Sequence, residues 1–111
     1  MEESQVIEAL SALAHDIRLR IVRHLVKCGK NGDSAGAIGD AVGAAPSKVT
    51  FHMAALQQAN LVTSERVSRH IIYRIEFDKV GLMLGYLMHD CCEGNKTVLS
   101  NCASRKGKSC C

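Results

Sequence analysis

The spacing of apolar residues changes from helical to strand-like once along this chain, at about Leu61. Before that point, apolar residues recur at the three- and four-residue spacings of amphipathic helices. Beyond it, the runs 62–67 and 71–75 are rich in β-branched residues and are separated by the polar stretch 68–70. We therefore predict a mainly α fold with a small β-hairpin.

Two amphipathic helices are predicted to open the chain. The first runs to about Ala14, and the second has Asp16 as its N-cap and ends near Cys28. The glycine-rich stretch 29–36 that follows is interpreted as a loop. Cys28 stands alone at the end of the second helix and is interpreted as a buried small hydrophobe.

Two shorter helices are predicted next, separated by a tight glycine turn. The first spans about 34–42, and the second begins with Pro46 in its first turn. With the hairpin behind it, this pair is typical of a winged helix-turn-helix, whose second helix can enter the major groove of DNA. The buried face of that helix is expected to hold Val49, Met53 and Leu56, with Ser47, Lys48, Phe51, His52 and Ala55 directed outward.

The last predicted helix, at 80–88, is apolar on nearly every side. One small domain cannot cover such a helix, which predicts a homodimer. We expect a domain over residues 1–93 and a flexible, cysteine-containing tail over 94–111. The apolar stretch is far below the roughly 20 residues of a membrane span, and the first ten residues lack the layout of a secretory signal. A cytoplasmic protein with no membrane partner is therefore expected.

Three segments of the chain resemble, in order and spacing, the ArsR/SmtB family of metal-responsive repressors: LSALAHDIRLRIVRHL, GDAVGAAPSKVTFHMAALQQANLV and SERVSRHIIYRI. The resemblance covers about residues 5–93 and implies a homodimeric repressor that binds double-stranded operator DNA. Asp16 departs from the family pattern by replacing a proline, Asn60 and Ser68 by replacing glycines, and Phe51 by replacing a polar residue. Because no phosphate-binding glycine loop, carboxylate pair or activated nucleophile stands at a recognisable spacing, an enzyme is not expected.

The resemblance assigns DNA contacts to the second helix of the motif and to the wing. Basic and hydroxyl side chains there suit phosphates, whereas His52 suits a base edge and Phe51 a thymine methyl group. Three alternatives stay open: His52 packs against the hairpin, Phe51 is a spare hydrophobe, or Arg66 and Arg69 belong to an ordinary solvated, charged hairpin. The net charge of +3, from 14 basic and 11 acidic residues, permits binding to nucleic acid without demonstrating it. The predicted DNA-binding residues are Ser47, Lys48, Thr50, Phe51, His52, Arg66 and Arg69.

Cysteine is concentrated at the C-terminus, where five of the six lie in the last 21 residues. In a cytosolic chain, such thiols favour metal or redox chemistry over a disulfide framework. Trivalent arsenic prefers three thiolates, which Cys91, Cys92 and Cys102 can supply, with Cys110 or Cys111 as alternative third ligands. The segment MHDCCEGN also resembles the vicinal-cysteine site of one branch of the arsenic repressors, which implies arsenite or antimonite as the inducer.

Two other functions remain open at this point. One is a redox-sensing repressor in which Cys91 or Cys92 forms a disulfide with a tail cysteine. The other is a thiol metal buffer that has no sequence-specific DNA binding. A zinc site built from His89, Asp90, Glu93 and Asp78 is disfavoured, because that helix carries a single histidine.

Overall fold

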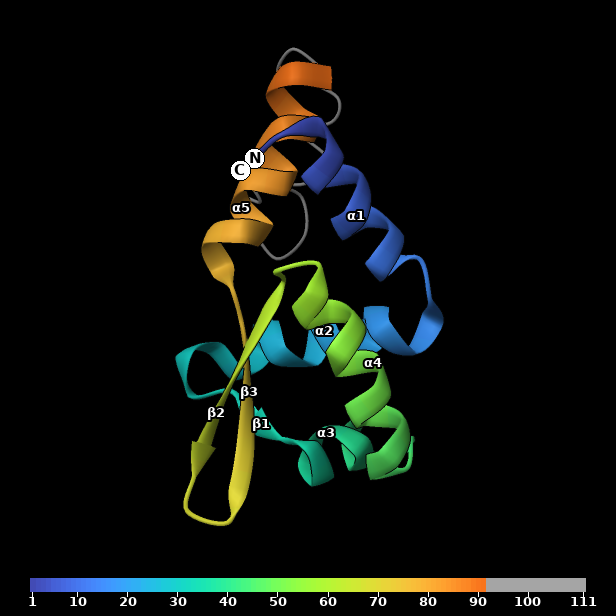
Figure 1. Ribbon diagram of the computed structural model, residues 1–111, viewed down its shortest axis with the longest axis vertical. Helices are drawn as coiled ribbons and strands as arrows, with labels where there is room; N and C mark the ends of the chain where they lie inside the picture. The colour runs from blue at the N-terminus through green and yellow to red at the C-terminus, as the bar shows by residue number, and fades with distance from the viewer. Residues whose placement is uncertain (92–111) are drawn as a thin grey trace.

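The computed structural model describes the backbone of residues 1–91 and the side chains of residues 1–88 (Figure 1). Helices α1 and α5 lie together at one end of the molecule, and the hairpin of β2 and β3 reaches toward the other. The predicted class, mainly helical with a small β structure, is confirmed. In chain order the elements are α1 (Glu3–Leu13), α2 (Asp16–Cys28), the 3₁₀ helix η1 (Gly29–Asn31), β1 (Asp33–Ser34), α3 (Ala35–Val42), α4 (Pro46–Gln58), β2 (Val62–Val67), β3 (His70–Ile75), α5 (Phe77–Gly85) and the π-helix η2 (Tyr86–Cys91).

The start of α2 differs from the prediction by one residue. His15, in extended conformation, is the N-cap, and its Nδ1 accepts a hydrogen bond from the backbone N–H of Ile17 at 3.2 Å. Asp16 is instead the first residue of the helix, where its carboxylate accepts from the same N–H at 2.8 Å. A negative charge at this position also favours the positive end of the helix dipole.

The sheet has three antiparallel strands in the order β1-β3-β2, so the interpretation of 29–36 as a loop is wrong. The two residues of β1, Asp33 and Ser34, pair with Tyr73 and Ile72 of β3. Gly32 makes this possible, because it has a φ of +65° and a Cβ there would lie 2.3 Å from the carbonyl oxygen of Tyr73. The predicted hairpin is confirmed, with Val62 opposite Ile75 at its base.

The core lies where α2, α3 and α4 meet the base of the hairpin. The buried residues predicted for α4, Val49, Met53 and Leu56, have no exposed surface. Truncation of one such leucine to alanine typically costs about 2–5 kcal/mol of stability. The largest fully buried side chains are Ile21, Leu25, Ile38, Val49, Met53, Leu56 and Leu61.

The last helix begins earlier than predicted, at Phe77, and widens into a π-helix from Tyr86. Its exposed apolar side chains include Phe77 and Leu82, which are 46% and 47% exposed. Within the described part of the chain, no helix combines the length and apolar character needed to cross a membrane. The predicted tail, 94–111, lies outside the described residues.

Candidate nucleic-acid interface

Helices α3 and α4 are joined by a turn that two glycines make possible. Gly43 adopts a φ of +73°, and its N–H donates to the carbonyl of Gly39 at 2.8 Å. The N–H of Ala44 donates to the same carbonyl at 3.0 Å. A Cβ on Gly39 would lie 2.6 Å from the carbonyl oxygen of Ala44, so a side chain there would push the turn apart. The turn therefore fixes the orientation of α4 relative to α3.

The outer face of α4 carries most of the predicted recognition residues. Ser47, Lys48, Thr50 and Phe51 are all exposed, and Phe51 is 67% exposed. The hydroxyl of Thr50 donates to the carbonyl of Pro46 at 3.0 Å, which leaves its methyl group and both oxygen lone pairs for other contacts. This face offers a cation, hydroxyls and an apolar ring to a neighbouring surface, which is a mixture suited to a DNA groove.

His52 does not belong to that face, and the prediction that it points outward is wrong. Its side chain is buried, at 6% exposure, and lies against the junction of α1 and α2. The Nε–H of Arg18 donates to His52 Nδ1 at 3.1 Å, and the ring of His15 stands 4.6 Å away. Burial lowers the pKa of His52, and the nearby His15, Arg18 and Lys48 lower it further. His52 thus joins the recognition helix to α2 as a neutral ring.

The wing presents both of its predicted contact residues. Arg66 on β2 and Arg69 in the turn are exposed. Farther from the tip, Arg74 donates to the carboxylate of Glu65 at 2.8 Å and to the carbonyl of Lys30 at 2.9 Å, which ties the hairpin to η1. The tip arginines are therefore displayed on a hairpin whose base is held in place.

Asn60 and Ser68, which stand where the family pattern has glycines, both adopt the positive φ that glycine favours. Asn60, between α4 and β2, has a φ of 63°, and Ser68, in the wing turn, has a φ of 59°. Asparagine tolerates this left-handed region better than most residues, whereas serine does so less readily. The turns keep a left-handed form without glycine.

The predicted arsenic ligands lie at or beyond the end of the described residues. Cys91 is the last residue of η2, and its side chain is not described; Cys92 and Cys102 fall outside the described residues. Of the disfavoured zinc set, Asp78 is exposed in the first turn of α5. The side chains of His89 and Asp90, and all of Glu93, fall outside the described part.

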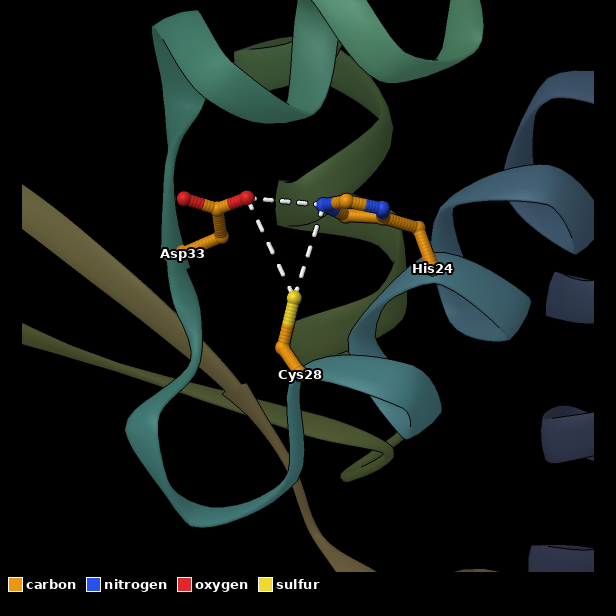
Figure 2. Close-up of side chains that lie close together, drawn as sticks. All are labelled: His24, Cys28 and Asp33. Carbon is orange, nitrogen blue, oxygen red and sulfur yellow. Dashed lines mark hydrogen bonds and ion pairs between the residues drawn. The ribbon is translucent and has the colours of Figure 1, made fainter.

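The interpretation of Cys28 as a buried hydrophobe is also wrong. Its side chain is half-buried and faces His24 and Asp33 (Figure 2). The four-residue spacing of His24 and Cys28 on a predicted helix was the available signal for part of this cluster. Asp33 could not be added to the cluster from sequence, because it lies on the two-residue strand β1, which the periodicity of apolar residues does not reveal.

These features define a winged helix-turn-helix DNA-binding protein, and comparisons with known proteins agree. Residues 13–65 match a family model described as a helix-turn-helix domain. NolR from Sinorhizobium fredii is 31% identical, with 78% of this chain and 84% of that chain covered and a TM-score of 0.62. No curated protein matches the chain in sequence.

Two further solved structures bear on the family. The homodimeric winged helix-turn-helix domain of Mb0332 from Mycobacterium bovis, described as "a possible ArsR-family transcriptional regulator", is 26% identical, with coverages of 78% and 84% and a TM-score of 0.64. An ArsR-like transcriptional regulator from Rhodococcus sp. RHA1 shares the fold, with a TM-score of 0.70, 22% identity and coverages of 88% and 90%. The chain belongs to the ArsR family of transcriptional regulators.

Proposed function

We propose that this regulator is a homodimeric repressor that leaves its operator when trivalent arsenic, supplied as arsenite or antimonite, binds its C-terminal cysteines. The observation that carries the DNA-binding part is the exposed face of α4 beside the wing arginines. The concentration of cysteine after α5 supports the choice of inducer.

Contacts to DNA would come from two surfaces of each subunit. Lys48 and Ser47 at the start of α4, with Arg66 and Arg69 on the wing, would bind phosphates. Thr50 and Phe51 would face base edges, where the ring of Phe51 suits a thymine methyl group. His52 is not part of this proposal, because its ring is occupied by Arg18.

The homodimer would form through α1 and α5, which both lie at the end of the molecule away from the wing (Figure 1). Ile7 and Leu10 on α1 are 55% and 39% exposed, and Leu82 on α5 is 47% exposed. Burial of such side chains against a second copy would remove apolar surface from water. Two recognition helices would then lie about one turn of DNA apart, on an imperfect palindrome.

The inducer site would be Cys91, Cys92 and Cys102. Three thiolates match the preference of trivalent arsenic. Because the site would lie at the end of the dimerising helix, bound arsenic would alter how the two subunits are held. Operator affinity would fall by roughly 1–3 kcal/mol, the usual range of allosteric coupling.

The test is a release experiment on an operator fragment selected from random-sequence DNA with the parent protein. We expect arsenite to release the parent from this fragment, while Cys91→Ser and Cys92→Ser bind it normally and stay bound. Cys110→Ser and Cys111→Ser are matched controls from the same tail and should respond like the parent. Release of Cys91→Ser and Cys92→Ser at the parent's arsenite concentration would place the inducer site elsewhere.

A further inference from the structure

A second group of metal-ligating side chains lies far in the sequence from the C-terminal cysteines. His24 and Cys28 stand one helical turn apart on α2, and Asp33 on β1 faces them (Figure 2). His24 Nε2 lies 2.7 Å from Asp33 Oδ2, and Cys28 Sγ lies 3.5 Å from the same nitrogen and 3.9 Å from the same oxygen. Three different donor atoms thus converge on one point.

The spacing of these atoms is close to that of a tetrahedral metal site. Zinc binds nitrogen and oxygen at about 2.0–2.2 Å and thiolate sulfur at about 2.3 Å, so tetrahedral angles separate nitrogen from oxygen by about 3.4 Å and sulfur from either by about 3.6 Å. The sulfur–nitrogen distance of 3.5 Å already fits. The sulfur–oxygen distance of 3.9 Å is only slightly longer than this geometry requires. The nitrogen–oxygen distance of 2.7 Å is that of a hydrogen bond, which an ion would replace and lengthen.

The surroundings suit an exchangeable ion. The His24 and Asp33 side chains are 25% and 26% exposed, so an ion has a path from solvent and water can fill a fourth position. A divalent cation that binds here would displace the Cys28 thiol proton to solvent as the thiolate–metal bond forms.

We propose that His24, Cys28 and Asp33 bind one divalent cation of the zinc type, with water as the fourth ligand. A nitrogen, a thiolate and a carboxylate form a donor set typical of this borderline-soft ion. The site is separate from the arsenic site and does not depend on it. A bound ion would join α2 to β1, which pairs with the wing strand β3 and leads directly into α3 through the N-cap Ser34. It would therefore hold the start of the helix-turn-helix.

The experiment uses the full chain with its five C-terminal cysteines replaced by serine, so that Cys28 is the only thiol. Co²⁺ is the probe, because a cobalt–thiolate bond absorbs in the near ultraviolet. We expect one Co²⁺ per chain with this absorption, displaced by Zn²⁺. Cys28→Ser should lose the absorption, and His24→Ala and Asp33→Asn should each weaken binding by at least about tenfold, since even the partners of metal ligands contribute 10–100-fold.

Matched controls are His70→Ala and Asp40→Asn, which alter exposed residues of the same types on β3 and α3. Both should bind Co²⁺ like the background chain. A chain without the thiolate absorption, or Cys28→Ser, His24→Ala and Asp33→Asn variants that bind as tightly as the controls, would overturn the proposal.

Thermal unfolding provides a second readout that does not depend on the cobalt spectrum. Since an ion that binds only the folded chain raises its stability, Zn²⁺ should raise the unfolding temperature of the background chain and not that of Cys28→Ser. Circular dichroism of the metal-free variants establishes that each is folded. An equal Zn²⁺ effect on the background chain and on folded Cys28→Ser would contradict the assignment.

Discussion

The helix-turn-helix end and the α1–α5 end of this molecule differ in how much of their structure one chain supplies. At the helix-turn-helix end, α4 buries Val49, Met53 and Leu56 completely, and its exposed face is polar except for Phe51. At the other end, apolar side chains such as Ile7 and Leu82 are about half exposed. The first region has its own buried core behind the surface that we propose for DNA, whereas the second leaves apolar area that a second copy would cover. We propose that arsenic binds near the α1–α5 end and lowers the affinity of the helix-turn-helix end for operator DNA.

The largest effect should follow from damage to the α1–α5 end. The double variant Ile7→Glu, Leu82→Glu would place charges in the proposed interface and separate the subunits. Because a monomer reaches one half-site, operator affinity should fall toward the non-specific level, by at least about 10³-fold. Sedimentation and operator titration measure the two effects. Val26→Glu, at a side chain 45% exposed on α2, is the control and should stay dimeric. A dimeric double variant would refute the interface.

Neighbouring residues of α4 should behave in opposite ways. His52→Ala removes the acceptor of the Arg18 hydrogen bond and should lower the free energy of unfolding by about 1–3 kcal/mol. Phe51→Ala, at an exposed side chain, should change stability by less than about 0.5 kcal/mol yet weaken operator binding. Urea unfolding and DNA titration separate these outcomes. A His52→Ala variant that keeps its stability but has a relaxed base preference would contradict this role and indicate that His52 contacts DNA.

Loss of a phosphate contact should have a smaller effect that depends on salt. Lys48→Ala and Arg69→Ala should each weaken binding on every DNA sequence, and because each removes one phosphate contact from both subunits of the dimer, each should reduce the logarithmic salt slope by about 1.8. Lys79→Ala, on α5 at the other end, is the matched control and should keep the parent slope. Equal slopes for all three variants would show that the DNA-facing surface is misassigned.

The smallest expected effect is a pH dependence of stability that arises from His52. Its pKa is lowered in the folded chain, so as the pH falls through the unfolded pKa, the unfolded chain binds more protons than the folded one. The contribution of neutral His52 is present above the unfolded pKa of about 6.5 and is lost as the pH falls. His52→Gln should flatten the loss of stability toward low pH, whereas exposed His70→Gln should leave it unchanged. Identical pH profiles of the two variants would contradict this role.

Much of the helix-turn-helix end could be predicted from sequence because its signals are local. Pro46, Gly43 and the apolar spacing of α4 placed the recognition helix, and β-branched runs placed the hairpin. The position of His52 was missed because its partners, His15 and Arg18, are brought to it by tertiary packing from 37 and 34 residues away in sequence. Strand β1 was missed because two residues carry no periodicity.

The assignment of the inducer cysteines rests on composition and resemblance and stays a prediction. The most direct test of the account is the affinity of the protein for arsenite, measured free and saturated with operator DNA, in a chain with Cys110→Ser and Cys111→Ser. Coupling between two sites is reciprocal, so operator should weaken arsenite binding by the same factor by which arsenite weakens operator binding, about 5–150-fold. Equal arsenite affinity with and without operator would contradict the claim that the two sites regulate each other.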